Sequence, residues 1–356
     1  MSAGLRARSR PGSAGRTPVG AARWFLVRLA ALIMAVVVMV AIGGFLLARQ
    51  ASGPTAAWAR ANGSDGLWIG HAWLAGAAGG PGRRNGTDLS ALTARIRKAR
   101  ISDVYVQAGQ VDAAGRLGPA QYAGAGPLLT SFRAALPHVR LCAWIGGTVG
   151  GGHLNLDDAS TRANIVASAS ALLHAGFGGI SYDLSPVASG DAGLLSLLTA
   201  TRALHPAVLS VTAPKLEPLA GMSLPAALIL RRPTFWSTGY LTQVADRVSQ
   251  VAVLSYDTGM PFPSWYSGYV ARETALALHA VPSGVGLVMG VPAFAGSTLG
   301  HHGSAETVAA ALRGVRAALT AGHHPRPGFG TGLYTADSAT PQDWSSYQSG
   351  WVQPSP

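Results

Sequence analysis

The sequence predicts an α/β protein, a closed (β/α)8 or TIM barrel preceded by one N-terminal transmembrane helix. Three observations predict it: a run of twenty uncharged residues near the N-terminus, eight short apolar segments between residues 66 and 335, and segments of helical spacing between them. Each apolar segment is too far from the next for a hairpin, so we expect parallel pairing through right-handed crossovers. Eight such units close most simply into a barrel.

The first element is the predicted membrane helix, residues 29–48. Its sequence LAALIMAVVVMVAIGGFLLA spans about 30 Å of hydrocarbon at helical rise. Residues 1–28 hold six Arg and no acidic residue, so the positive-inside rule predicts a cytoplasmic tail and a single pass through the cell membrane, with the rest of the chain extracytoplasmic. A cleaved signal peptide is the alternative, but the apolar run is long for one and ARQASG offers no small-x-small cleavage site.

The net charge of +12 is concentrated in this N-terminal part. Residues 1–60 hold eight Arg and no acid, which leaves 19 basic against 15 acidic residues in 61–356. This balance excludes nucleic-acid binding as the reason for the charge. The preference for Arg over Lys, with abundant Ala and Gly, is typical of a GC-rich bacterial genome. A single Cys excludes a disulfide framework, and the apolar surroundings of Cys142 predict a buried, unreactive thiol.

Residues 49–64 lack periodicity and are predicted to be a linker, so the barrel is expected over 65–353. The predicted strands are, in order, 66–74, 103–109, 140–147, 179–186, 207–214, 250–257, 286–292 and 330–335. Helical spacing follows in segments such as DLSALTARIRKAR and SAETVAAALRGVRAALTAG, and PQDWSSYQSGWV supplies a last short helix. A doubly wound open sheet is the alternative topology, but no Gly-rich fingerprint follows the first strand.

Polar residues stand at the carboxyl ends of these strands, where a barrel of this kind carries its site. On the fourth strand, Ser181, Asp183 and Ser185 alternate with apolar residues, which places all three on the interior face. A buried Asp183 needs a hydrogen bond or a ligand. A structural carboxylate bonded to Tyr256 or to a backbone amide and a ligand-facing carboxylate are both open.

Other side chains at the strand ends suit a sugar ligand. Tyr256 and Asp257 end the sixth strand as a hydroxyl and a carboxylate side by side, with a strand cap as the alternative role of Asp257. Aromatic rings suit stacking on sugar rings, although a lone aromatic residue also serves in simple packing. The predicted aromatic and polar rim comprises Trp144, Tyr334, Trp344, His71, Gln107 and Lys215.

No metal site is predicted. Two His-His pairs, at 301–302 and 323–324, lie in Gly- and Pro-rich segments. No acidic residue stands at the spacing of a zinc motif, so these histidines are predicted to be solvated loop residues. On the first strand, His71 is followed by Trp73 where a metal-dependent hydrolase would carry a second His. GGTVGGGH lacks the ending of a phosphate loop and is predicted to be a flexible loop.

Four segments resemble family 18 glycoside hydrolases. AGFGGISYDLSPV resembles the fourth-strand signature D-x-x-D-x-D-x-E, VAVLSYDTGMP the sixth-strand M-x-Y-D, GLVMGVPAF the seventh strand, and GFGTGLYTADSATPQDWSSYQSGWV the closing strand and helix. The resemblance is chitinase-like and covers the predicted ectodomain in order. It implies a barrel without a cofactor and retaining hydrolysis of β-linked N-acetylglucosamine polymers, in which the substrate's acetamido oxygen attacks C1.

Carried over position by position, the resemblance makes Asp183 the residue that stabilises the acetamido group, Tyr256 the residue that holds it, and Asp257 the adjacent carboxylate. The position of the acid Glu is occupied by Ser185. A serine hydroxyl has no proton acidic enough for this step near neutral pH, and general acid catalysis contributes about 10²- to 10⁴-fold. Family-type turnover is therefore expected to be weak or lost.

Two further acids of the signature are replaced, by Gly178 and Ser181. The sequence therefore predicts a membrane-anchored barrel of the cell envelope, a pseudoenzyme that recognises N-acetylhexosamine-containing glycans. Its expected partners are the lipid bilayer, through 29–48, and a glycan. One alternative is an active glycosidase or transglycosylase with a displaced acid, Glu217 or Asp257. The other is a non-catalytic envelope scaffold whose partners bind the outer helices.

Overall fold

A computed structural model describes residues 18–75, 86–217, 235–298, 300–322 and 325–354. The chain forms two compact units, residues up to Leu46 and Leu47–Pro356. Helix α1 (Pro18–Gln50) contains the predicted span 29–48. Its segment Arg23–Gln50 contains an 18-residue window with a mean hydropathy of 2.8 and is long and apolar enough to cross a membrane, properties that an N-terminal signal sequence shares.

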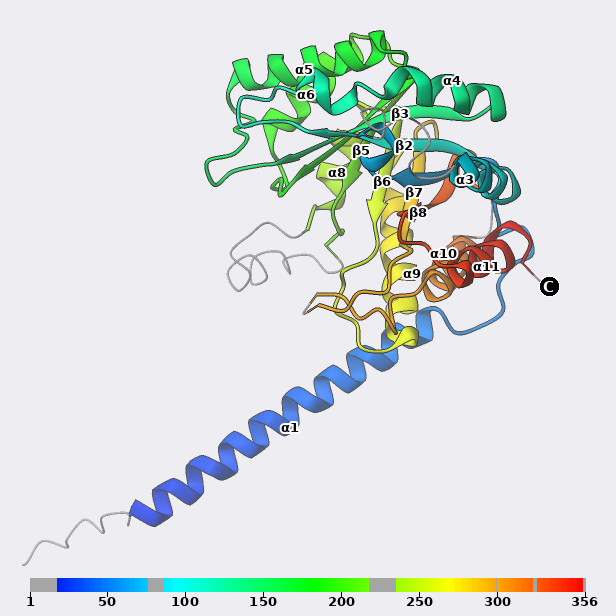
Figure 1. Ribbon diagram of the computed structural model, residues 1–356. Helices are drawn as coiled ribbons and strands as arrows, with labels where there is room; N and C mark the ends of the chain where they lie inside the picture. Colours follow the sequence, from blue (N-terminus) through cyan, green and yellow to red (C-terminus); the bar gives the residue numbers. More distant parts are fainter. Residues whose placement is uncertain (1–17, 76–85, 218–234, 299, 323–324, 355–356) are drawn as a thin grey trace, which may run out of the picture. The chain divides into compact units, whose positions relative to one another are not determined.

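The second unit contains a closed barrel of eight parallel strands, in which each strand pairs with the next and β8 pairs with β1 (Figure 1). The predicted (β/α)8 barrel is confirmed and the open sheet is excluded. The strands are β1 (Asp65–Ile69), β2 (Ile101–Gln110), β3 (Arg140–Thr148), β4 (Gly179–Ser185), β5 (Val208–Ala213), β6 (Gln250–Leu254), β7 (Gly286–Pro292) and β8 (Phe329–Tyr334).

Helices follow the strands on the outside of the barrel. They are α2 (Ala72–Ala75), α3 (Gly86–Ala99), α4 (Ala125–Ala135), α5 (Ala159–His174), α6 (Ala192–Arg202), α8 (Thr238–Ala245), α9 (Pro263–Ala280), α10 (Val308–Gly322) and α11 (Pro341–Tyr347), with the short turns η2 (Pro119–Tyr122) and η3 (Gln348–Val352). Side-chain caps fix several starts, as Asp191 does by accepting the Leu194 N–H at 2.7 Å at the start of α6.

The first strand is shorter than predicted. It ends at Ile69, and residues 72–75 form the short helix α2. The carboxylate of Asp337, beyond the end of β8, accepts the backbone N–H of Gly70 at 2.6 Å and the indole N–H of Trp73 at 2.8 Å. These two hydrogen bonds stabilise a turn after β1. Residues 70–74, which the sequence predicts to be extended, therefore form a turn and the start of a helix.

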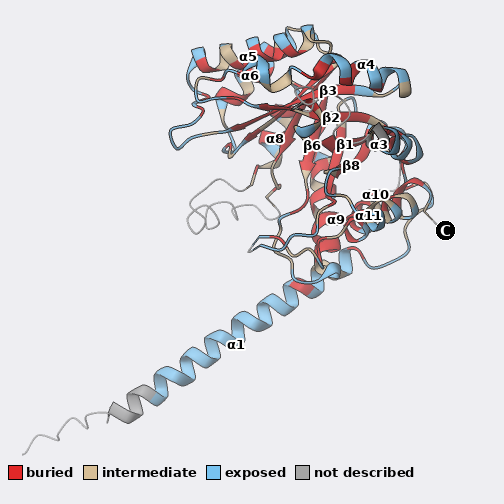
Figure 2. Ribbon diagram, viewed as in Figure 1, coloured by how far each residue is buried: buried red, intermediate tan, exposed pale blue. Residues whose placement is uncertain are grey.

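Two hydrophobic clusters occupy the two sides of the barrel wall. The larger one lies between the strands and the helices, and Figure 2 shows the strands as mostly buried. The smaller one fills the barrel interior and consists of Trp68, Tyr105, Cys142, Trp144, Val208, Ala252 and Val288, with Tyr334 packed against it. The prediction that Cys142 is buried is confirmed, and burial raises the pKa of its thiol.

The amino end of the barrel is closed by what we call the floor network: Asp103, Tyr105, Arg140 and Gln250. The fully buried Asp103 accepts from Arg140 Nε at 2.6 Å, from Arg140 Nη2 at 2.8 Å and from Gln250 Nε2 at 3.0 Å. The Tyr105 hydroxyl donates to Gln250 Oε1 at 2.6 Å. Each buried polar group of the floor thus has a partner, which removes the penalty of its burial.

The predicted linker is attached to the barrel over residues 56–61. Ala59 is fully buried, and its carbonyl accepts from Arg316 Nε of α10 at 2.9 Å. The Ala56 N–H donates to Thr320 Oγ1 at 2.9 Å, and the Ala61 N–H donates to the Trp351 carbonyl at 3.0 Å. Small Ala side chains allow this close approach, so this stretch belongs to the barrel unit.

Candidate functional site

A cavity of about 220 Å³ opens at the carboxyl ends of β4, β5 and β6, and we call it the mouth cavity. Five residues that the sequence predicts at the site line it: Asp183, Ser185, Lys215, Tyr256 and Asp257. The rest of its wall is Leu184, Pro186, Val187, Thr212, Pro214 and Leu254. Parallel strands bring their carboxyl ends to one rim, so residues up to 74 positions apart in the chain meet here.

The strand period places the polar residues of β4 at successive heights. Ser181 is fully buried inside the barrel, Asp183 is partly exposed and Ser185 is exposed. Burial raises the pKa of Asp183 to about 6, and the donor effect of the Trp144 indole opposes this rise. Among the described residues, no hydroxyl or backbone amide bonds this carboxylate, which favours the ligand-facing role over the structural one.

Aromatic rings form one wall beside the mouth cavity. Tyr256, 6% exposed, stacks on Tyr334 with ring centroids 5.2 Å apart, and Trp144 meets the edge of Tyr334 at 5.8 Å. Phe294, which follows β7, packs edge-on against Tyr256 at 5.5 Å. Burial raises the pKa of Tyr256 well above its ordinary value, so its phenol is neutral. Phe294 is not among the residues predicted at the site, although it lies in the segment GLVMGVPAF.

Asp257 has a left-handed backbone, with φ of 56°. Its carbonyl oxygen accepts from Lys215 Nζ, and its half-exposed carboxylate lies with Oδ1 3.2 Å from His301 Nδ1. Burial raises the pKa of the carboxyl, and the electrostatic interactions of Asp257 with His301 and Lys215 act against this rise. No backbone N–H within the described residues donates to the carboxylate, so it does not cap the strand.

The prediction of solvated histidines is wrong for His301, which is 2% exposed. Its Nδ1 lies 3.2 Å from Asp257 Oδ1 and 3.2 Å from Oε2 of Glu306, a fully buried residue. The loop after β7 folds over the loop after β6, with Gly259 N–H bonded to the Gly300 carbonyl at 2.8 Å. His301, Asp257 and Glu306 therefore come together because two loops pack on each other. The spacing of residues within one loop does not indicate this contact. Residues 323–324 lie outside the described residues.

Two rim residues pair with each other. The His71 backbone N–H donates to Gln107 Oε1 at 3.1 Å, and its Nδ1 lies 3.2 Å from the Gln107 carbonyl oxygen. They join the ends of β1 and β2 but do not line the mouth cavity. Glu217 is half-buried just beyond the lining residue Lys215, and its backbone N–H donates to the Trp236 carbonyl at 3.0 Å.

Trp344 is not brought into the mouth. It lies on α11, packs against the outer hydrophobic cluster, and has the Arg95 guanidinium of α3 5.7 Å from its ring centroid. Because α11 runs along the outside of the barrel, a ring at this position contacts neighbouring helices. Its predicted role in substrate binding is therefore unsupported.

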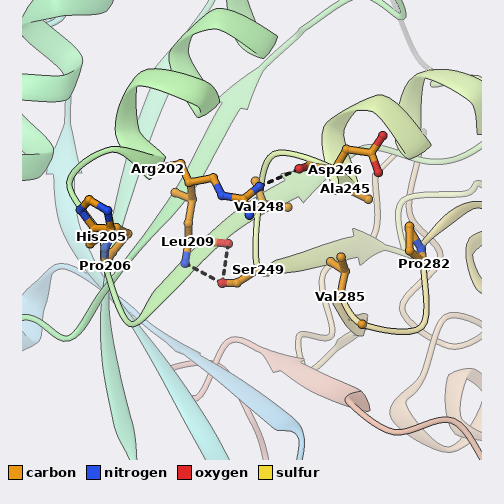
Figure 3. A pocket seen from close by; sticks show the side chains of 11 residues that line it. Arg202, His205, Pro206, Leu209, Ala245, Asp246, Val248, Ser249, Pro282 and Val285 are labelled. Carbon is orange, nitrogen blue, oxygen red and sulfur yellow. Dashed lines mark hydrogen bonds between the residues drawn. The ribbon is translucent and has the colours of Figure 1, made fainter.

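A larger cavity, about 520 Å³, lies at the amino ends of β5, β6 and β7 (Figure 3). Two of its polar side chains have partners: Arg202 Nη1 donates to the Asp246 carbonyl at 2.8 Å, and Ser249 Oγ accepts from Leu209 N at 2.9 Å. Size alone does not identify the functional end, and the mouth cavity, which is lined by the predicted residues Asp183, Tyr256 and Asp257, is the better candidate.

No protein-family model matches the sequence, and no curated protein is similar to it. Solved structures are similar in fold. The Bacillus cereus spore cortex-lytic enzyme SleL has a TM-score of 0.56 at 12% identity, covering 81% of this chain and 74% of its own. A class V chitinase mutant from Cycas revoluta in complex with (GlcNAc)3 has a TM-score of 0.55 at 13% identity, covering 81% and 99%.

A class V chitinase from Pseudomonas fluorescens is similar at a TM-score of 0.52 and 14% identity, covering 80% of this chain and 98% of its own. Another matching structure is a family 18 chitinase from Cycas revoluta. The barrel thus has the fold of the family 18 chitinases and SleL. At these sequence identities the similarity establishes the fold alone. Any activity has to be argued from the residues at the mouth cavity.

Proposed function

We propose that this chain is a membrane-anchored barrel that binds N-acetylhexosamine-containing glycans at its mouth and hydrolyses them weakly or not at all. The observation that carries the proposal is the mouth cavity itself. It combines a carboxylate without a hydroxyl or amide partner, Asp183, with the neutral phenol of Tyr256, and it has the exposed hydroxyl of Ser185 where the resemblance implies a carboxylic acid.

The chemistry of the mouth suits an acetamido sugar. A carboxylate accepts a hydrogen bond from an amide N–H, and a neutral phenol donates one to an amide oxygen. The aromatic wall of Tyr256, Tyr334 and Trp144 offers apolar surface beside these groups. The cavity, about 220 Å³, is smaller than the roughly 300–1,000 Å³ of ligand pockets, which suits one sugar ring of a longer chain.

The proposed loss of turnover rests on the proton donor. Cleavage of a glycosidic bond requires a group that protonates the leaving oxygen, and the hydroxyl of Ser185 cannot supply that proton near neutral pH. Asp183 would still orient the acetamido group. Binding without efficient cleavage is the expected result.

The proposed anchor is α1. Its apolar segment is long enough to cross the bilayer, and the Arg-rich residues before it favour a cytoplasmic N-terminus by the positive-inside rule. The barrel would then face the cell envelope, where glycan polymers are found. Protease protection of the barrel in spheroplasts would contradict this orientation, whereas its digestion from outside would support it.

The decisive experiment mixes the full chain in detergent micelles with N-acetylglucosamine oligomers and with peptidoglycan fragments, and follows binding by calorimetry and products by mass spectrometry. We expect binding by the unmodified protein, at least about tenfold weaker binding by the double variant Asp183→Ala, Tyr256→Phe, and products only from Ser185→Glu. Asp246→Asn, at an exposed position on the opposite end, is the matched control.

Two outcomes would replace the proposal. Cleavage by the unmodified protein as fast as by Ser185→Glu, and abolished by Asp183→Asn, would identify an active hydrolase with a displaced acid, and Glu217→Gln would then test the nearest alternative. Absence of binding to every glycan, with the fold intact by circular dichroism, would favour the scaffold reading, in which partners bind the outer helices.

A further inference from the structure

Three side chains from two loops converge beside the mouth cavity: Asp257 after β6, and His301 and Glu306 after β7. Their ligand atoms all lie within 4.8 Å of one another. His301 Nδ1 is 3.2 Å from Asp257 Oδ1 and 3.2 Å from Glu306 Oε2. Ligand atoms about 2.0–2.2 Å from a tetrahedral zinc ion are themselves about 3.3 Å apart. The two distances from His301 Nδ1 therefore match the spacing of ligands around such an ion.

The supporting contacts hold two of these groups in place. Glu306 Oε1 accepts from Thr258 N at 3.1 Å, from Thr258 Oγ1 at 3.1 Å and from Gly259 N at 3.0 Å, which directs Oε2 toward His301. The His301 ring stacks on Phe294 with centroids 4.4 Å apart. Metal sites are characteristically supported in this way, because outer contacts orient the ligands before the ion binds.

Buried polar atoms without partners point to the same place. His301 is 2% exposed, and neither of its ring nitrogens makes a hydrogen bond of good geometry with the described residues. The Tyr266 hydroxyl is fully buried, equally unbonded, and subject to the negative charges of Glu306 and Asp257. Buried polar groups are normally satisfied, so the two unbonded ring nitrogens of His301, beside two carboxylates, favour an additional ligand at this place.

We propose that Asp257, His301 and Glu306 bind a divalent transition-metal cation at the rim of the mouth cavity. Two carboxylates and one neutral imidazole supply a charge of −2, and Lys215, whose Nζ donates to the Asp257 carbonyl, adds one positive charge nearby. The imidazole favours Zn²⁺ over Ca²⁺, which takes six to eight oxygen ligands. Because the Asp257 carboxylate is half exposed, a water or a sugar hydroxyl can reach the ion.

The competing explanation is a proton. A protonated Nδ1 of His301 shared by the two carboxylates would give the same distances without a metal. Only the metal explanation predicts binding of one metal ion per chain. Neither explanation depends on glycan binding, so this inference can fail while the proposed function holds, and the reverse.

The test uses the full chain in detergent micelles, purified without a polyhistidine tag and stripped with a chelator. Zn²⁺, Mn²⁺ and Ca²⁺ are titrated separately by calorimetry, and bound metal is counted by mass spectrometry after gel filtration. We expect one equivalent of Zn²⁺, weaker Mn²⁺, no Ca²⁺, and at least about tenfold weaker Zn²⁺ binding in Asp257→Asn, His301→Gln and Glu306→Gln.

Matched controls separate the site from other metal-binding groups. His302→Gln changes the adjacent imidazole and Asp246→Asn changes an exposed carboxylate, and both should bind Zn²⁺ as the unmodified protein does. Asp257→Asn is the most informative variant, because its half-exposed side chain contributes little to the core. No Zn²⁺ binding by the folded protein, or one equivalent that all three ligand variants retain, would overturn the proposal in favour of the shared proton.

Discussion

The two ends of the barrel both contain buried polar residues, but these residues differ in how many hydrogen bonds they make. At the amino end, the floor network pairs every polar group: Asp103 accepts three hydrogen bonds from Arg140 and Gln250. At the carboxyl end, no hydroxyl or backbone amide of the described residues bonds to Asp183, and the His301 ring and the Tyr266 hydroxyl are buried with no hydrogen bond to these residues.

This difference teaches that buried polarity by itself does not identify a functional end. The larger cavity of Figure 3 lies at the amino end, where the floor network is fully paired, and the smaller one lies at the carboxyl end, beside Asp183. A satisfied network stabilises the fold, whereas unsatisfied groups lower stability unless a ligand completes them. The same substitution should therefore have opposite effects at the two ends.

The largest expected effect is at the floor. Asp103→Asn removes the charge that pairs with Arg140 and leaves the guanidinium poorly matched. Breaking a buried pair lowers stability by about 3–5 kcal/mol, and because Arg140 is half exposed we expect about 2–3 kcal/mol. Urea unfolding of the full chain, followed by tryptophan fluorescence, measures the change. Asp246→Asn should change it by less than about 0.5 kcal/mol; equal effects of the two variants would refute the structural role of the floor.

A comparable effect is expected at the mouth side as the pH rises. Burial raises the pKa of Glu273 on α9 from 4.5 to about 8. Between these values the folded state holds a proton that the unfolded state has released, so stability falls with rising pH, by about 1.4 kcal/mol per unit. From pH 6 to pH 8 the unmodified protein should lose about 2 kcal/mol more than Glu273→Gln. Parallel pH profiles of the two proteins would show that the carboxyl is already ionised.

The sharpest contrast with the floor is Asp183→Asn. Burial raises the pKa of Asp183 from 3.8 to about 6, so stability falls as the pH rises between these two values and the loss is complete above about pH 6. The shift corresponds to about 3 kcal/mol, which partial exposure of the side chain reduces to about 1–2 kcal/mol. The variant should be more stable than the unmodified protein at pH 7 and equal to it below pH 4. Destabilisation at pH 7 would mean that this end is satisfied like the floor.

The smallest effect is expected at Ser185. Its side chain is exposed at the end of β4, so Ser185→Ala should change the free energy of unfolding by less than about 0.5 kcal/mol. Thermal unfolding in the same micelles measures it. A decrease in the free energy of unfolding of more than about 1 kcal/mol would mean that the hydroxyl has a structural role. It would argue against the view that Ser185 occupies the position of a lost catalytic acid.

The fold could be predicted because its signals are local. Apolar runs of strand length, helical spacing between them, and a cap such as Asp191 each act within a few residues, and all eight strands were found. The packing of Ala59 on α10 could not be predicted, since an Ala-rich stretch without periodicity looks like a linker.

The site was predictable only in part. Alternation on β4 placed Asp183 and Ser185 at the mouth, because strand period is a property of the chain alone. The contact of Asp257 with His301 and Glu306 depends on how two loops fold over each other, which no spacing encodes. Trp344 was assigned to the mouth from its aromatic character, and only the direction of α11 shows that it faces neighbouring helices.

The lone thiol inside the barrel has a practical consequence. Cys142 is fully buried in the interior cluster, and its raised pKa keeps it in the unreactive thiol form. An alkylating reagent can therefore modify it only when the barrel opens around it. The rate of modification in intact cells reports how often the barrel opens, with no engineered label and no purification, for this chain and for each of its variants.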